Sequence, residues 1–292
     1  MTIIGLLRWI VRHPLNRARK ADAVMRFVRW QLASRLIAQP IALPFVGETR
    51  LLVSRGMTGA TGNWYCGLHE DAEMGFVLHA LRPADLFADI GANVGSYTVL
   101  AAGAVGASVI AAEPVPATYA RLQANIRLND LSSRVDAQCC GVSDCEGALL
   151  FTADLDTMNR IALPDEQRPT ISVPVVPLDA LCGARRPAIV KIDVEGHEAA
   201  VLDGGTTVLQ SADCLAVLME TNGSGEKFGV SDDQLLARIV AFGFQPCIYD
   251  AVHRRLSRVE RGGANTIFVR DVEQMAARCA AAPRYQLVNG SI

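Results

Sequence analysis

Short apolar runs alternate with helical patterns along the central part of the chain. Runs typical of buried strands lie at residues 86–90, 107–113, 135–143, 188–194, 214–220, 245–250 and 265–269. Apolar residues spaced three and four apart predict helices between them, at 94–104, 116–129, 197–210 and 231–242. Because most strands are apolar throughout, the pattern predicts an α/β domain with a mostly parallel sheet and helices on both faces.

The chain before this pattern is expected to hold smaller elements. Residues 41–54 alternate around a Gly-Glu turn and are predicted to form a short hairpin. The glycine-rich stretch 55–63 lacks the Gly-Lys-Ser/Thr ending of a phosphate loop, so we expect a flexible connection there. Residues 66–83 have the apolar spacing of a helix. These patterns divide the chain into a basic amphipathic helical arm, a β lead-in, a main domain and a C-terminal tail, at residues 1–40, 41–65, 66–272 and 273–292.

The arm combines apolar and basic positions. Its arginines are interleaved with large apolar residues at roughly helical spacing, at Arg8, Arg12, Arg17, Arg19, Arg26, Arg29 and Arg35. Arg8 and Arg12 break the opening apolar run, which is too short to span a bilayer. Positive charge follows this run and no small-residue cleavage site is evident, so we expect no signal peptide. The arm either lies on an anionic membrane surface or, as we favour, packs its apolar stripe on the main domain or a partner subunit.

Composition narrows the classes of function. The 292 residues are 50% hydrophobic with a mean hydropathy of +0.22, which supports a sizeable core and argues against extensive disorder. The net charge of −2 argues against electrostatic capture of nucleic acid. Eight cysteines occur without a CxxC pair or a zinc-type Cys/His spacing. We therefore expect no zinc site and a reducing, cytoplasmic location, with peripheral membrane contact through the arm as an alternative.

A glycine turn after the first strand of the main domain carries the clearest chemical signal. It runs from Asp89 to Gly95 as D-I-G-A-N-V-G, whereas a dinucleotide site would have G-x-G-x-x-G. Asp89 at the strand end would repel a pyrophosphate but would suit the amino group of a methionine moiety. Glu113 ends the next strand, 24 positions later, where an acid commonly accepts both ribose hydroxyls. The pair of acids favours S-adenosylmethionine over a nicotinamide dinucleotide.

Several motifs in order resemble the FkbM family of S-adenosylmethionine-dependent methyltransferases. They are "FADIGANVGSYTVLAA" (87–102), "AAEPVPATYARLQANIRLN" (111–129), "GVSD" (141–144), "VPLDAL" (176–181) and "IVKIDVEGHEAAVLDGG" (189–205). The resemblance covers about residues 66–270. It implies a class I methyltransferase (Rossmann-like) three-layer sandwich with a seven-stranded sheet, and mostly O-methylation of small hydroxylated molecules. Gly141, where many family members have alanine, is a minor departure.

The resemblance also implies roles for individual residues. On the methionine side of the cofactor it places the turn residues Asp89, Gly91, Asn93 and Gly95. Tyr65 and Glu70, from the segment that precedes the first strand of the main domain, are expected at the same end of the cofactor. Glu113, followed by Pro114, would hold the ribose, and Ser143 and Asp144 would lie near the adenine edge. Asp193 would end the fourth strand beside the sulfonium and the methyl acceptor.

The segment "KIDVEGHE" (191–198) brings five ionisable residues to this predicted site. Methyl transfer to a hydroxyl needs a base, and His197 titrates near neutrality, although it could equally be a solvated residue of a helix first turn. Asp193 is the stronger catalytic candidate because of its position. Asp193, Glu195 and Glu220 could alternatively bind Mg²⁺ through oxygen, but carboxylates at a site more often accept hydrogen bonds, so we expect no metal.

Three other functions are compatible with parts of the sequence. A DNA or RNA amino-methyltransferase would have [DN]-P-P-[FYW] where this chain has Asp193-Val194-Glu195-Gly196, so no nucleic-acid partner is expected. A nicotinamide-dependent oxidoreductase and an inactive cofactor-binding scaffold recruited through the basic arm remain as alternatives. We expect O-methylation of a small molecule or of a glycan- or lipid-linked sugar, with the polar stretch 152–170 forming a mobile loop over the pocket. The sequence determines neither the acceptor nor the oligomeric state.

Overall fold

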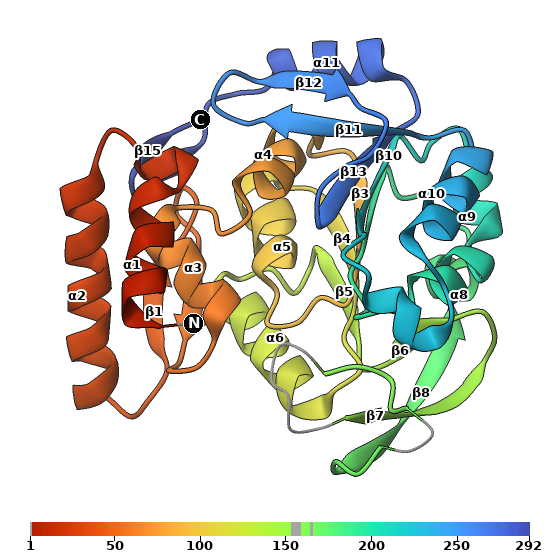
Figure 1. Cartoon of the computed structure of the whole chain (residues 1–292), viewed down its shortest axis with the longest axis horizontal. Helices are drawn as coiled ribbons and strands as arrows, with labels where there is room; N and C mark the ends of the chain where they lie inside the picture. Colours follow the sequence, from red (N-terminus) through yellow and green to blue (C-terminus); the bar gives the residue numbers. More distant parts are fainter. Residues whose placement is uncertain (1, 153–158, 164–165) are drawn as a thin grey trace.

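The computed structural model describes residues 2–152, 159–163 and 166–292 of the chain (Figure 1). The predicted loop over 152–170 therefore lies partly outside the described residues. The remaining predicted elements can all be compared with the structure.

An eight-stranded sheet forms the centre of the described structure (Figure 1). Its strands, in chain order, are β3 (Leu86–Ile90), β4 (Ser108–Ala112), β5 (Val135–Gln138), β9 (Ile189–Ile192), β10 (Ala216–Glu220), β11 (Gln245–Asp250), β12 (Arg255–Arg258) and β13 (Asn265–Val269). Their spatial order is β12-β11-β13-β10-β9-β3-β4-β5. Neighbours from β10 to β5 are parallel, whereas β13 is antiparallel to both β10 and β11. The prediction of a mostly parallel α/β sheet is confirmed.

The sheet has one strand more than the seven predicted. The additional strand, β12, pairs antiparallel with β11 at the edge. Its residues form a polar segment that had no strand-like apolar run, and only Leu256 in it is buried. The tight turn after β11 includes Arg254 at φ +53° and leads the chain directly into this pairing. Backbone pairing at an edge, and not burial of an apolar face, therefore produces this strand.

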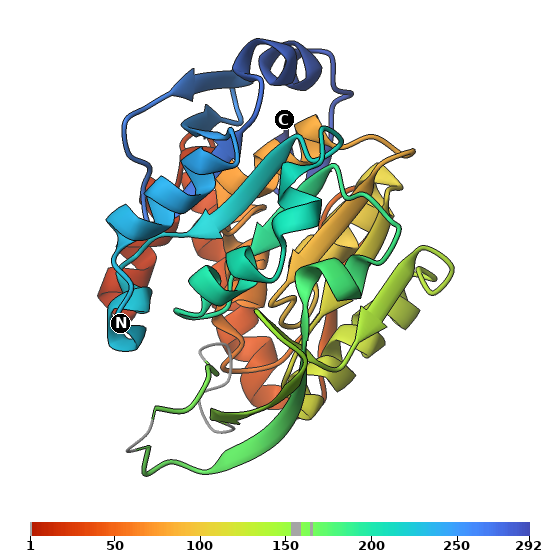
Figure 2. The ribbon, with the colours of Figure 1, turned by 90° about the vertical axis from the view of Figure 1, so that its right-hand side faces the viewer.

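Helices cover both faces of the sheet and complete the expected three layers (Figures 1 and 2). One face carries α4 (Asp71–Ala80), α5 (Ser96–Val99) with a π-helical continuation (Leu100–Val105), α6 (Pro116–Leu128) and α11 (Val272–Ala280). The other carries α7 (Leu178–Cys182), α8 (Glu198–Asp203), α9 (Thr206–Gln210) and α10 (Asp232–Ala241). Phe87 of β3 enters the first core, and its neighbours Ala88 and Ile90 enter the second. This alternation shows why the strands had to be apolar on both faces.

Two predicted elements are divided. The predicted strand 135–143 ends at Gln138, and β6 (Gly141–Ser143) instead joins β8 (Thr170–Pro177) and β7 (Gly147–Thr152) in a small second sheet that projects below the domain (Figures 1 and 2). The predicted helix 197–210 breaks at Gly204 and Gly205. A Cβ at Gly204 would overlap the carbonyl oxygen of Ser143, so the helix break brings this backbone against β6. Both divisions result from packing between segments far apart in sequence.

The glycine-rich stretch 55–63 is helical, and the expectation of a flexible connection was wrong. Helix α3 (Thr58–Cys66) includes most of it. Ala60, Tyr65 and Cys66 are almost fully buried, and Gly62 lies tightly against the ring of His69. Burial against neighbouring elements outweighs the low intrinsic helix propensity of glycine here.

The N-terminal arm folds onto the domain. It consists of α1 (Ile3–Arg12), a 3₁₀ turn (Pro14–Asn16) and α2 (Lys20–Leu36), followed by the predicted hairpin of β1 (Ile41–Pro44) and β2 (Arg50–Val53). Ile10, Phe27 and Trp30 are buried in the same core as α4. The buried Arg26 donates to the carbonyl oxygen of Tyr65 at 2.9 Å. One face of the arm therefore packs on the chain's own domain, as the favoured interpretation predicted.

The C-terminal segment is ordered against the arm. After α11, β14 (Gln286–Leu287) and β15 (Gly290–Ser291) form a small hairpin. Between them, Asn289 donates to the carbonyl oxygens of Leu15 and Cys66. No helix in the part of the chain that the structure describes is both long and apolar enough to cross a bilayer.

Candidate functional site

Two adjoining cavities open where the carboxyl ends of β3, β4, β9 and β10 meet. The first is lined by Ile90, Gly91, Asn93, Ala112, Glu113, Pro114, Cys140, Gly141, Val142, Phe151, Asn159, Ile161, Asp193, Val194, Glu195 and His197. The second is lined by Met57, Thr58, Gly59, Ala60, Asn63, His69, Glu70, Met74, Gly91, Ala92, Asn93, Val94, Ser96, Tyr97, Lys191, Asp193, Glu195 and Glu220. Gly91, Asn93, Asp193 and Glu195 line both. A ligand crossing the glycine turn could therefore occupy both cavities.

The glycine turn is shaped by close backbone contacts. Gly91 has φ +79°, and a Cβ there would overlap the carbonyl oxygen of Asp193. The amides of Gly91 and Ala92 both donate to the carbonyl oxygen of Ala112 at 3.0 Å, which holds the turn against β4. Gly95 also has positive φ (+89°), but a Cβ there would meet Leu122 of α6. Gly91 therefore shapes the cavity wall, whereas Gly95 permits helix packing.

Glu113 is fixed at the wall of the first cavity, beside Pro114. Its side chain is 6% exposed, and its two oxygens accept hydrogen bonds from the amides of Asn93 (2.9 Å) and Val115 (3.0 Å). Burial raises the pKa of Glu113 to about 7. A positioned carboxylate with acceptor capacity remaining is suited to bind hydroxyl donors.

Asp89 lies beneath the turn and is not among the described residues that line either cavity. It is fully buried; Thr98 donates to Oδ2 at 2.6 Å, and the Lys191 ammonium lies 3.8 Å from Oδ1. Burial raises the pKa of Asp89. The structure thus places this acid as a support for Lys191 and α5, whereas the sequence analysis expected it to face the cofactor's amino group.

Lys191 connects the two acids at the strand ends and was given no role by the sequence analysis. Its Nζ donates to Asp193 Oδ2 at 3.0 Å and to the carbonyl oxygen of Gly91 at 3.3 Å. Burial alone would lower the pKa of Lys191, but the nearby carboxylates of Asp193 and Asp89 raise it above its usual value. The ammonium therefore stays charged. The available signal was a lysine inside the apolar run of β9, two residues before Asp193 and hence on the same face.

Glu70 lies at the far wall of the second cavity. Tyr97 donates to Oε2 at 2.6 Å, and Asn265 of β13 donates to Oε1 at 3.1 Å. The structure thus brings the predicted residue Glu70 to the same cavity as Asp193. Tyr65 is buried under the arm instead, and it is not among the described lining residues.

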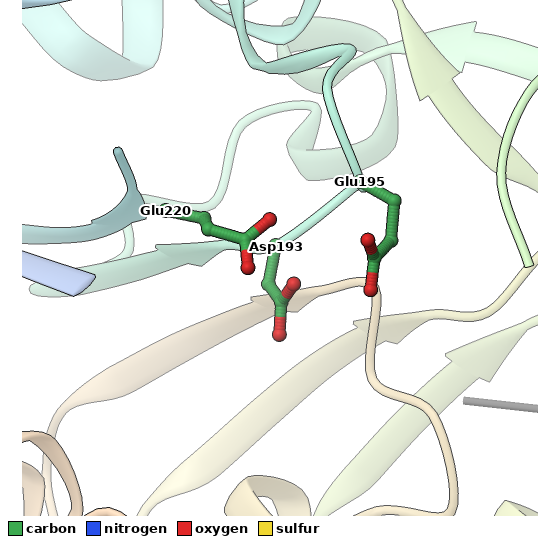
Figure 3. Close-up of side chains that lie close together, drawn as sticks. All are labelled: Asp193, Glu195 and Glu220. Atoms are coloured by element: carbon green, nitrogen blue, oxygen red, sulfur yellow. The ribbon is translucent and has the colours of Figure 1, made fainter. Parts of the chain in front are cut away.

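Three carboxylates gather at the junction of the cavities (Figure 3). Oxygens of Asp193, Glu195 and Glu220 all lie within 4.8 Å of one another. Burial raises the pKa of Glu195 to about 6 and that of Glu220 to about 8. Glu195 has φ +56°, and the loop that carries it is held by Glu198, whose Oε1 accepts from the Gly196 amide at 3.0 Å. Such oxygens can take a proton, accept hydroxyl hydrogen bonds or hold a divalent cation.

His197 lines the first cavity, on the side away from Glu220. Its Nε2 lies 2.9 Å from Ser143 Oγ, which itself donates to Asp144 at 3.0 Å. Burial lowers the pKa of His197, which favours the neutral ring. Ser143 and Asp144 are not among the described lining residues of either cavity, and Ser143 is linked to the first cavity by its hydrogen bond with His197.

Comparison with known proteins identifies the family. The family model described as "Methyltransferase FkbM domain" matches residues 89–246, more than half of the chain. The chain belongs to the FkbM methyltransferase family. The family uses S-adenosylmethionine, in agreement with the cofactor predicted from the glycine turn and its acids.

Two curated proteins resemble parts of this FkbM-family chain. Hexuronic acid methyltransferase AglP of Haloferax volcanii is 29% identical over 144 residues, which is 48% of this chain and 58% of AglP. 31-O-demethyl-FK506 methyltransferase FkbM of Streptomyces tacrolimicus is 40% identical over 73 residues, 25% of this chain and 27% of that protein. The matches thus span less than two thirds of either relative. A solved O-methyltransferase of Thermotoga maritima has 14% identity and a TM-score of 0.37, covering 67% of this chain and 62% of that one.

The residues of the FkbM-family site fit S-adenosylmethionine. The backbone at Gly91 leaves no room for a side chain between the two cavities. Glu113 offers a buried acceptor to ribose hydroxyls on one side, and Glu70 offers a carboxylate to an amino group on the other. When bound, this cofactor supplies an electrophilic methyl group.

Proposed function

We propose that this FkbM-family protein is an O-methyltransferase that acts on a hydroxyl group of a small molecule or of a glycan- or lipid-linked sugar. The observation that carries the proposal is the carboxylate cluster of Asp193, Glu195 and Glu220 at the junction of the two cavities. An acceptor hydroxyl loses its proton as it attacks a methyl carbon, and a positioned carboxylate can take that proton. The name of the second relative, which specifies an O-demethyl acceptor, supports transfer to oxygen.

The charge of the second cavity favours a neutral acceptor. Acidic side chains line it at Glu70, Asp193, Glu195 and Glu220, of which Glu220, with its pKa raised by burial to about 8, is largely protonated near pH 7. Lys191, the cation among its described lining residues, is already paired with Asp193. Burial lowers the pKa of His69, which also lines it, so this ring is expected to be neutral. An anionic group would be repelled by such a wall. We therefore expect a neutral sugar hydroxyl to be preferred over a uronic acid, although AglP is named for a hexuronic acid.

The test begins with calorimetric titration of the purified protein with S-adenosylmethionine, with NADH and NADPH as controls. Acceptors are then screened with methyl-labelled cofactor on matched pairs of neutral sugars and uronic acids, and NMR locates the methyl group on the product. Transfer to oxygen of a neutral sugar supports the proposal. Saturable cofactor binding without transfer to any hydroxyl would favour the inactive scaffold.

Asp193→Asn tests the role of the carboxylate cluster. It removes a negative charge from the cluster and from the Lys191 pair, and we expect kcat to fall by about 100-fold or more. The exposed Asp213→Asn, whose carboxylate accepts a hydrogen bond from the Ser211 hydroxyl at 3.4 Å and lies outside both cavities, is the matched control and should retain wild-type kcat. Equal kcat in both variants would contradict this assignment. Parallel assays with EDTA and with added Mg²⁺ determine whether methyl transfer depends on a divalent cation bound by these carboxylate oxygens.

A further inference from the structure

Helix α2 has apolar residues on two opposite faces. Ala23, Phe27 and Trp30 recur at helical spacing and are buried against the domain. The opposite side carries the outer face of α2, which we define by its exposed apolar residues: Val24, Met25, Val28, Leu32 and Leu36. These recur at spacings of three and four, so they form a continuous stripe. Packing on the domain explains only the first of these faces.

The outer face of α2 is open to solvent. Leu32 is 60% exposed and Leu36 is 83% exposed. Figure 1 shows α2 as the outermost helix on its side of the molecule, with α1 and α3 between it and the sheet. A stripe of large apolar side chains at this position is costly in water, and such stripes mark surfaces that bind something.

Cations border the outer face. Arg29 and Arg35 lie in α2 beside the stripe, Lys20 lies at its first turn, and Arg17 and Arg19 precede it; all five are exposed. Asp22 is the acidic residue of α2. An amphipathic helix with long basic side chains at its edges can bury its apolar stripe at the acyl boundary while the cations reach anionic headgroups. A second copy of the chain would instead oppose arginines to arginines across a symmetric contact.

We infer that the outer face of α2 docks this protein on an anionic lipid bilayer, with the helix axis in the plane of the membrane surface. The apolar stripe supplies insertion, and Arg29, Arg35 and Lys20 supply the preference for anionic headgroups. This inference rests on the arm alone and does not depend on the proposed methyl acceptor.

The test is flotation of the full-length protein with vesicles of phosphatidylcholine alone or mixed with phosphatidylglycerol. Val28→Glu combined with Leu32→Glu places two anions in the stripe and is expected to weaken binding to anionic vesicles at least about tenfold. Val240→Glu combined with Val252→Glu is the matched control, because these residues are 46% and 52% exposed and lie outside the arm. Arg29→Gln combined with Arg35→Gln should weaken binding and reduce its sensitivity to salt.

Flotation of the wild type and of the control with anionic vesicles, together with loss in the Val28/Leu32 variant, supports the inference. A wild type that does not float with anionic vesicles overturns it, as does undiminished flotation of the Val28/Leu32 variant. Sedimentation analysis tests the alternative partner, a second copy of the chain. If the wild type is a dimer that does not bind vesicles, and the Val28/Leu32 variant is a monomer, the outer face of α2 is an interface between two copies. Unchanged thermal unfolding of all variants shows that a lost interaction is not lost folding, since every substituted side chain is exposed.

Discussion

Glu113 is predicted by a sequence motif, and its pKa can be tested by experiment. An acid at the end of the second strand was predicted from its spacing to Asp89, and its position at the wall of the first cavity agrees with that expectation. The structure adds that both oxygens are held by backbone amides and that burial raises its pKa to about 7. Its acceptor strength therefore changes within the physiological range of pH.

Affinity for S-adenosylmethionine should depend on pH through Glu113. On the proposed role of Glu113, the ionised carboxylate would accept the ribose hydroxyls, and the proton taken up as pH falls through about 7 would remove acceptor capacity. We expect the Kd measured by calorimetry to rise about tenfold between pH 8 and pH 6. Glu113→Gln should bind about 100-fold more weakly and with little dependence on pH in this range. A parallel pH profile in wild type and variant would contradict the assignment.

Gly91 should tolerate no side chain. A Cβ would overlap a backbone oxygen of Asp193, which cannot move without displacing β9, so Gly91→Ala should cost more than about 3 kcal/mol of unfolding free energy. Gly47→Ala is the matched control, because Gly47 also has positive φ (+57°) but has nothing within 4 Å of a Cβ. It should cost only about 1 to 2 kcal/mol. Urea unfolding measures both, and equal costs would show that the contact with Asp193 is unimportant.

At the scale of elements, the two faces of α2 have different roles: one packs on the domain and the other is exposed to solvent. Trp30 is 4% exposed and its helix contacts α1 and α3, so Trp30→Ala should cost about 3 to 5 kcal/mol. Leu32→Ala, two residues away on the outer face, should change the free energy of unfolding by less than about 0.5 kcal/mol. Chemical denaturation of the two variants distinguishes the faces. A large loss at Leu32 would mean that this face already has a structural partner in solution.

At the scale of the whole molecule, buried acids should make stability depend on pH. Burial raises the pKa of both Glu73 and Glu113 to about 7, well above the value of 4.5 in an unfolded chain. Between these values the folded state binds more protons than the unfolded state, so stability falls as pH rises through about 7. We expect Glu73 and Glu113 together to contribute a loss on the order of 1 to 2 kcal/mol from pH 6.5 to pH 8.5 without cofactor, and urea unfolding is the measurement.

Glu113→Gln provides the check on this pH dependence. It removes one of the buried ionisable groups and should flatten the decline above pH 6.5, whereas the exposed Glu48→Gln should leave it unchanged. An equal change in stability from pH 6.5 to pH 8.5 in wild type and Glu113→Gln would contradict this assignment. The histidines act in the opposite direction, because burial lowers the pKa of His13, His69, His79 and His197 below the ordinary value that they regain on unfolding. The difference between wild type and Glu113→Gln, and not the wild-type slope alone, therefore measures the contribution of Glu113.

The sequence by itself determined the features that depend on local pattern. Apolar strand runs, helical spacing and the D-x-G-x-x-x-G turn predicted the layers, the sheet, the family and the cofactor, because strand and helix periods and positive-φ glycines are properties of neighbouring residues. Gly91, Asn93, Glu113 and Asp193 line the cavities at the carboxyl ends of the strands. Helix α3, the edge strand β12 and the two divided elements departed from these local patterns.

The tertiary structure alone decided how the ionisable residues are arranged at the site, including that Asp89 does not line the cavities, although the sequence already grouped Asp193, Glu195 and Glu220 as possible Mg²⁺ ligands. Asp89 faces inward to Lys191 because β9 lies beside β3, although about 100 residues separate them. Glu220 joins Asp193 because β10 follows β9 in the sheet, and Glu70 joins them because α4 packs over β13. Strand order and helix packing result from burial of the whole core, so no local pattern encodes these contacts. The same packing leaves one apolar face of α2 covered and the other exposed to solvent.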